Sequence, residues 1–292
     1  MGSSMSSGSW QEITQRNARS VQTLIGWIFW DPGAIRRYEA FGLAGPLGYI
    51  AARCAPLAPA GPEAVCAAFG SISPIGIAIA FDILETPEAF QEVSKARDEA
   101  VRDGFEEFAA EAIEPLTSLR TQLWDVVDAL PMEGRVLFAT HRAAERTDDP
   151  LISAWHAVNC LREWRGDSHW AVVVAYGLTH GEASILHNSW VNYEPDWLAR
   201  SRGTSDEVID AGWADLERKG LAQSRTITPE GIAIRQNIED ETDAITTLPW
   251  ELFGKKASVA FAETFEPACE KLLARVDLTA GPNYQPASRI RR

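Results

Sequence analysis

Residues 155–170, "WHAVNCLREWRGDSHW", contain most of the side chains in this sequence that could carry out acid–base chemistry. Apolar residues surround the first part, as in a helix that is buried on most sides. Four polar residues lie at offsets of zero, three, four and seven and therefore share one helical stripe: His156, Asn159, Cys160 and Glu163. Burying an imidazole and a carboxylate is costly unless they are paired. The stripe must therefore face partners, water or a ligand.

A turn is predicted directly after this stripe. Gly166 suits the position that follows a helix, and Asp167 could cap the next one. His169 would then lie in the first helical turn, where the helix dipole disfavours the imidazolium and leaves a neutral base. For Gly166 and Asp167 alone, a capping role is the simpler interpretation. Taken together, the segment gives a candidate catalytic set: His156, Glu163, Arg165, Asp167 and His169.

A second polar group lies further along the chain. Arg235, Glu239 and Thr242 are spaced four and three apart and so share a helical face. They can form part of a binding site, or a solvated face with one Arg–Glu pair, and the spacing leaves both open. The candidate substrate-binding residues are Trp155, Asn159, Cys160, Arg235, Glu239 and Thr242.

The residue types indicate acid–base chemistry without a cofactor. In this hypothesis His169 is the base, His156 is the partner acid held by Glu163, and Arg165 stabilises a developing oxyanion. The histidines and carboxylates could ligate a metal, but their spacing matches no short zinc motif, and no haem attachment motif is present. No glycine-rich phosphate loop and no GxSxG motif occurs. We therefore predict neither a metal nor another cofactor.

Periodicity and capping residues predict a mainly α protein, with a helical N-terminal domain followed by a C-terminal winged-helix domain. Thr228 and Pro229 open a long helix after the short ribbon "LAQSRTI", and "TSDEVIDAGWADLERKG" precedes that ribbon as a helix. The predicted parts are residues 1–9 as a tag or disordered start, 10–130 as the helical domain, 131–190 as a central helical pair with the polar turn, 191–254 as the winged helix, and 255–292 as a C-terminal helix and tail.

Several segments carry a family resemblance. The run "DLERKGLAQSRTITPEG" is similar to the segment from recognition helix to wing in MarR-type regulators. The chain also resembles an actinobacterial helix-turn-helix family in "APLAPAGPEAVCAAF", "WHAVNCLREWRGDSH", "GLTHGEA" and "RQNIEDETDAITTLPWELFG". The resemblance implies a MarR-like winged helix and a dimer.

The composition restricts the partners. The formal net charge of −14 repels phosphate, and the predicted recognition helix carries five acids against Arg218 and Lys219, so the sequence argues against DNA as a partner. The four cysteines show no paired spacing, which is typical of reduced cytoplasmic proteins. No apolar run is long enough to span a membrane.

Three functions fit these observations. The first is an acid–base enzyme, of lyase, isomerase or hydrolase type, that acts on a hydrophobic small molecule. The alternative is a ligand-responsive regulator of the MarR type, and a third is a binding protein without turnover. We also expect a homodimer, because of the winged-helix resemblance and because apolar residues such as Trp213 and Trp250 need covering.

Overall fold

The computed structural model describes residues 8–289, so most of the predicted N-terminal tag lies outside the described residues. The fold is mainly α, as the sequence predicts. The helical body begins with α1 (Trp10–Gly26), a 3-10 turn (Trp27–Trp30), α2 (Pro32–Glu39), α3 (Leu47–Cys54), α4 (Pro62–Ala68), α5 (Pro74–Leu84), α6 (Pro87–Phe108), α7 (Ile113–Ser118), α8 (Arg120–Ala129) and α9 (Val136–Ala143). Capping residues fix several starts; Asp31, for example, accepts hydrogen bonds from the amides of Gly33 and Ala34 at the start of α2.

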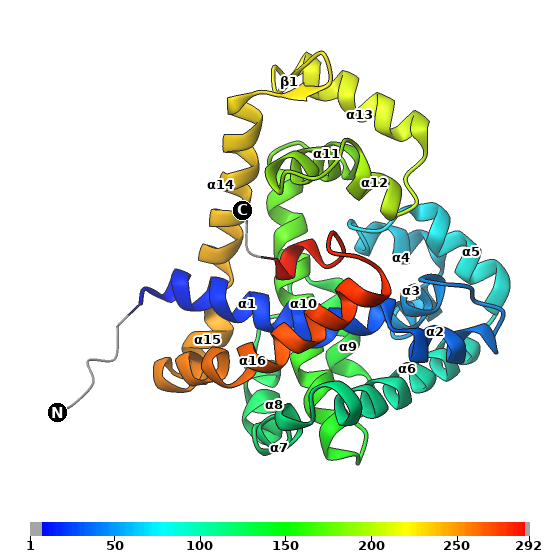
Figure 1. Cartoon of the computed structure of the whole chain (residues 1–292), viewed down its shortest axis with the longest axis vertical. Coiled ribbons are helices and arrows are strands. Elements are labelled where there is room, and N and C mark those ends of the chain that lie inside the picture. The colour runs from blue at the N-terminus through cyan, green and yellow to red at the C-terminus, as the bar shows by residue number, and fades with distance from the viewer. Residues whose placement is uncertain (1–7, 290–292) are drawn as a thin grey trace.

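The long helix α10 (Pro150–Ala175) is the centre of the molecule. It contacts α1, α8 and α9 of the body and α14 of the winged helix (Figure 1). The helix runs through Gly166 and Asp167 without a break, so the predicted turn and the predicted pair of central helices are wrong. A glycine costs a helix only about 1 kcal/mol. Buried residues on both sides of it, from Trp164 to Val173, hold the helix together by packing.

The winged-helix unit comprises α11 (His180–Trp190), α12 (Trp197–Ser201), α13 (Asp206–Arg218), the antiparallel strands β1 (Ala222–Gln223) and β2 (Thr226–Ile227), and α14 (Pro229–Ile245). Thr228 caps α14 through the amide of Gly231, as predicted. The unit has its own apolar core, which extends from Val172 to Ile238. The unit therefore begins at the end of α10, before the predicted boundary at residue 191.

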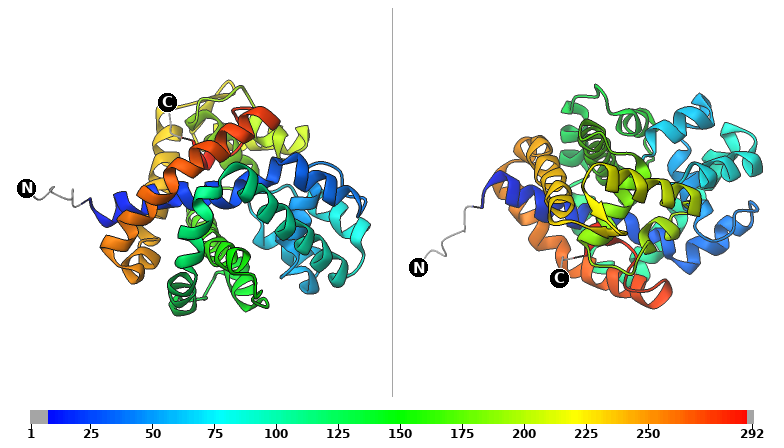
Figure 2. Two further views of the ribbon diagram at one scale, coloured as in Figure 1. Left: turned by 60° about the horizontal axis from the view of Figure 1, so that its bottom comes forward. Right: turned by 90° about the horizontal axis from the view of Figure 1, so that it is seen from above.

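The chain then returns to the helical body. Helix α15 (Leu248–Phe253) is followed by α16 (Lys255–Thr279), which packs beside α1 (Figure 2). A last 3-10 turn (Pro286–Ser288) also contacts α1. Trp213 and Trp250 are buried inside this single chain, Trp213 in the winged-helix core and Trp250 against Phe253 and Phe261. They therefore do not need a second subunit to cover them, contrary to expectation.

Candidate functional site

A cavity of about 720 Å³ lies between the helical body and the winged-helix unit. Its lining comes from α1, the second half of α10 and the C-terminal segment on one side, and from α11 and α14 on the other. Cavities of about 300–1,000 Å³ are typical of small-molecule sites. A molecule bound here would contact both units of the protein at once.

The lining is rich in positive charge, although the whole chain is acidic. It includes four carboxylates, Glu12, Asp167, Glu239 and Glu266, against eight arginines: Arg16, Arg19, Arg53, Arg162, Arg165, Arg202, Arg235 and Arg289. Several of these arginines are paired with carboxylates behind the lining, as Arg19 is with Glu270. The cavity nevertheless concentrates cations in a protein of net charge −14.

One wall of the cavity is an ionic network between α10 and α14. Arg165 contacts Glu239 through Nη2 and Oε1 at 2.7 Å, and it lies 2.8 Å from Asp243. Glu239 also accepts from Nη2 of Arg235 at 2.7 Å. Burial alone would raise the pKa of Glu239, but Arg235 and Arg165 lower it well below its usual value. The structure therefore joins Arg165, from the first predicted group, to the second predicted group on α14.

His169 lies beside this network and lines the cavity. Its Nδ1 is 3.0 Å from Oγ1 of Thr242, and that hydroxyl donates to the carbonyl of Ile238 at 2.6 Å. Because the hydroxyl has only one proton, it must accept from Nδ1–H of His169. Burial lowers the pKa of His169 to about 4, so the ring is neutral at pH 7. Its Nε2 therefore carries a lone pair that can accept a proton or a hydrogen bond.

Glu163 does not hold His156, contrary to the hypothesis from sequence. It is fully buried and accepts from Arg53 twice, Nε–Oε1 at 2.8 Å and Nη2–Oε2 at 2.5 Å. Arg162 donates a third bond at 2.8 Å. Burial alone would raise the pKa of Glu163, but the Arg53 guanidinium lowers it to about 2. Glu163 is thus a carboxylate that ties α10 to α3.

His156 occupies a different part of the molecule. Its Nε2 lies 3.0 Å from Asp98 on α6, and Arg97 approaches the same atom at 3.4 Å. His156 and His169 are 13 residues apart on one helix, which corresponds to about 20 Å along the axis. The two histidines therefore cannot act on the same substrate atoms, and the predicted acid–base pair is wrong.

Asp167 caps a helix, but not the helix that was predicted. Its Oδ2 accepts from the backbone amide of Phe138, 2.9 Å away, near the start of α9. Burial raises the pKa of Asp167 to about 7, and this hydrogen bond only partly offsets the effect. Because Asp167 also lines the cavity, it is a carboxyl group that can exchange a proton near neutral pH.

The remaining predicted residues on α10 are buried in the helical body and do not line the cavity. The indole of Trp155 donates to the carbonyl of Leu24 at 2.9 Å, and Asn159 lies 3.2 Å from Nδ1 of His141. Burial raises the pKa of Cys160, which makes it an inert thiol. These three side chains pack and connect helices.

Most of the cavity lining was missed by the sequence analysis, including two residues whose pKa is strongly shifted. Burial lowers the pKa of His187 on α11 well below its usual value, and the charges of Arg235 and Arg202 lower it further. Arg202 follows α12, and burial lowers its pKa to about 10, with a further contribution from Arg235. Nothing in the spacing of either residue marks it. For His187, the one signal in the sequence was a histidine placed within the apolar run "ILHNSW".

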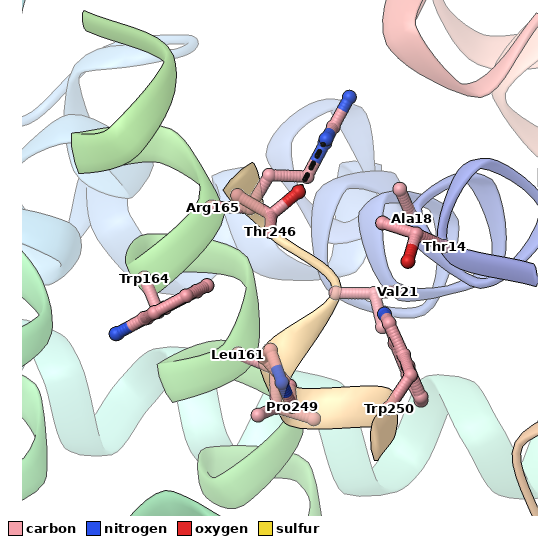
Figure 3. Close-up of a pocket in the computed structure, with 9 residues that line it drawn as sticks. All are labelled: Thr14, Ala18, Val21, Leu161, Trp164, Arg165, Thr246, Pro249 and Trp250. Carbon is pink, nitrogen blue, oxygen red and sulfur yellow. Dashed lines mark hydrogen bonds between the residues drawn. The ribbon is translucent and has the colours of Figure 1, made fainter. Parts of the chain in front are cut away.

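A second cavity, of about 20 Å³, lies behind Arg165, where α1, α10 and α15 meet (Figure 3). Arg165 donates to Thr246 at its edge, and apolar residues such as Leu161 and Trp250 line the rest. This volume holds about one water molecule. It is a packing gap next to the network rather than a ligand site.

Residues 8–289 contain no cluster of three or more histidine, cysteine or acidic side chains that could hold a metal ion. Within the same residues, no helix combines the length and apolar character needed to cross a membrane.

The helix α13 precedes the two-stranded wing, in the position of a recognition helix. Its exposed residues include Asp206, Glu207 and Asp210, and Arg218 near its end pairs with Asp215. The wing turns at Ser224 and Arg225, and Arg225 pairs with Asp210 and with Asp196. This face therefore carries cations, but they are held by neighbouring carboxylates.

A family model described as a helix-turn-helix family matches residues 14–279. No curated protein matches the chain, and neither does any solved structure. The helix-turn-helix is a DNA-binding motif, so this match overturns the expectation that DNA is not a partner. That expectation used the net charge, which is a sum over all residues, and the charges of one predicted helix, and it left out Arg200 and Arg225, which the fold places near α13 and in the wing. Since the match covers the helical body as well as the winged helix, the chain belongs to this helix-turn-helix family.

Proposed function

We propose that the protein is a ligand-responsive regulator of the MarR-like winged-helix type. In this proposal the winged-helix unit binds DNA, and a small molecule in the 720 Å³ cavity changes that binding. The observation that carries the proposal is the position of the cavity between the two units. A ligand there would touch α14, which follows the wing directly, and α10, which belongs to the helical body.

The coupling follows from the contacts of α14. Arg235 and Glu239 line the cavity from the middle of α14, and the N-terminus of the same helix is joined to β2 through Thr228. A ligand that binds one arrangement of α10 and α14 more tightly than another would shift the wing and α13 with it. A ligand effect of this kind is reciprocal, because DNA must change ligand affinity by the same factor.

The proposed DNA face consists of α13, the wing and the end of α12 that lies before α13. Its exposed cations are Arg200, Arg218, Lys219 and Arg225, and each forms an ion pair with a carboxylate. Four phosphate contacts give a slope of log K against log salt concentration of about −4 per chain, and about −7 for a dimer. DNA binding by this protein should therefore be moderate and sensitive to salt.

The experiment is a selection from random duplexes, followed by affinity measurements on the selected sequence between 50 and 200 mM salt, a range over which about four phosphate contacts already give a measurable slope. Arg218→Gln should weaken binding and reduce the slope by about 1 per chain, and so by about 2 for a dimer, because each chain loses one phosphate contact. Arg36→Gln, an exposed arginine on α2, is the matched control and should change neither. Failure to enrich any duplex would refute the regulator.

A second candidate function, an acid–base enzyme, is favoured by one observation. A neutral imidazole with a free Nε2, His169, and a carboxyl group with a pKa of about 7, Asp167, both line the cavity. General acid–base catalysis works best with a pKa near the working pH, which Asp167 has, whereas His169 would be a weaker base. This version keeps His169 as the base and omits His156 and Glu163. It requires that His169→Ala abolish turnover of a bound compound while His156→Ala does not.

A further inference from the structure

Arg202 differs from the other arginines of the cavity network. Arg165 and Arg235 both pair with Glu239, whereas the guanidinium of Arg202 pairs with no carboxylate and donates no hydrogen bond to any residue in the range 8–289. It is partly buried and lines the cavity. An unpaired guanidinium in a partly buried position needs an acceptor.

Arg235, near Arg202, also has a hydrogen-bond donor without an acceptor in the described part of the chain. It is only 4% exposed, and its Nη1 has no hydrogen-bond partner among residues 8–289. Its guanidinium lies over the ring of Trp190 in a cation–π contact, with Cζ 4.7 Å from the centroid. The two arginines are close enough that the charge of Arg235 lowers the pKa of Arg202. Two like charges held together in this way are stabilised by an anion between them.

The charges of the groups around Arg202 and Arg235 indicate which charge a bound ligand should carry. Three arginines, Arg165, Arg202 and Arg235, face two carboxylates, Glu239 and Asp243, which leaves a net charge of +1. His169 and His187, which also face this group, are neutral at pH 7 because burial lowers their pKa. A monoanion balances this site, whereas a phosphate dianion would exceed it and approach Glu239.

We propose that the cavity binds a small molecule with a carboxylate group, which forms a bidentate ion pair with Arg202 beside Arg235. This inference rests on the proposed function, since it names the class of ligand for the same cavity. The planar guanidinium matches a carboxylate in a two-bond, fork-like arrangement. Neutral His187 can accept or donate a single hydrogen bond with a polar group of the ligand, whereas the Nε2 of His169 can only accept one.

The rest of the cavity selects an apolar body for this acid. Trp170, Val173, Leu178 and Ile238 line it, and Trp190 lies under Arg235. Apolar walls with a few convergent polar groups are typical of sites for drug-sized ligands. An aryl or long-chain carboxylic acid therefore fits better than a small polar acid such as acetate.

The test uses the full-length protein with defined probes. Benzoate, 1-naphthoate and 4-phenylbenzoate, each with its matching amide, are titrated at constant ionic strength and followed by calorimetry and thermal melting. We expect at least one carboxylate to bind and to raise the melting temperature, and its amide to bind at least about tenfold more weakly, because a charged hydrogen bond is lost. Arg202→Gln should weaken carboxylate binding by about 10- to 100-fold.

Three variants make the result interpretable. Arg202→Lys keeps the charge but loses the planar fork, so we expect an intermediate loss of affinity. Arg36→Gln should bind as the wild type does. The melting curve of Arg202→Gln without ligand shows whether it folds, and if it does not, Arg202→Lys decides. Lack of binding by every carboxylate, equal binding of acid and amide, unchanged affinity in the Arg202 variants, or tighter binding of phenyl phosphate than of benzoate would each overturn the proposal.

The outcomes separate this inference from the proposed function. Carboxylate binding that depends on Arg202 but leaves DNA affinity unchanged supports the carboxylate site and removes the regulator. DNA affinity that responds to a neutral ligand or to phenyl phosphate supports the regulator and removes the carboxylate site.

Discussion

The substitution Glu163→Gln tests whether this buried carboxylate holds the fold or works in a site. In the structure its two oxygens accept three charged hydrogen bonds, two from Arg53 and one from Arg162. The glutamine oxygen can take the bonds from Arg53 Nε and Arg162, but its amide NH₂ then faces Nη2 of Arg53, donor against donor. Breaking a buried ion pair from one side costs about 3–5 kcal/mol, because the other charge stays buried without compensation.

Denaturation with urea, followed by circular dichroism, measures this loss in the free energy of unfolding. Glu92→Gln is the matched control, because Glu92 pairs with Lys95 on an exposed face, and it should cost under about 1 kcal/mol. Replacing both Arg53 and Glu163 with leucine should cost less than Glu163→Gln alone, since the guanidinium of Arg53 is removed together with its partner, and Arg162, the one cation that loses Glu163, still donates to Gln22. A Glu163→Gln protein within about 1 kcal/mol of the wild type would refute the structural role.

Three further predictions follow from the site and the family. Asp167→Asn keeps an acceptor for the amide of Phe138 but cannot ionise. Because burial raises the pKa of Asp167 to about 7, the wild type loses stability as pH rises from about 4 to 7. Urea melts should therefore show that the free energy of unfolding of the variant rises by about 2–4 kcal/mol relative to the wild type across that window. A variant that tracks the wild type at every pH would contradict this. Glu239→Gln removes the carboxylate nearest Arg235 and should tighten benzoate binding by about threefold or more, whereas weaker binding would contradict the charge balance. We also predict a homodimer, from the winged-helix resemblance alone, and a clean monomer in sedimentation at micromolar concentration would remove it.

Local signals predicted the winged helix well. Thr228 and Pro229 mark the start of α14, and Gly220 marks the end of the helix before the ribbon, because caps and breakers depend on neighbouring residues only. The start of the unit was misplaced, since α11 has little periodic pattern and packs with the end of α10. Helix α11 belongs to the winged-helix core because of its tertiary contacts, which a local sequence pattern does not reveal.

The sequence predicted the residues that α14 contributes to the candidate site, but not their partners on other helices. Arg235, Glu239 and Thr242 share a face of α14, and the sequence placed them together correctly. Their link to Arg165 and His169 spans more than 70 residues, so no local spacing could reveal it. Glu163 was assigned to His156 because both lie on one stripe, but its true partner, Arg53, comes from 110 residues away. A buried carboxylate takes the best guanidinium that the fold supplies, and sequence distance does not limit that choice.

A ligand in the cavity is proposed to change how the winged helix binds DNA. The most direct measurement is the affinity for the selected duplex, by fluorescence anisotropy at fixed salt, with and without a saturating concentration of the carboxylate that binds most tightly. We predict a change of about fivefold or more, lost in Arg202→Gln, because allosteric coupling is typically worth about 1–3 kcal/mol. Equal affinity with and without the bound carboxylate would show that the cavity does not control DNA binding.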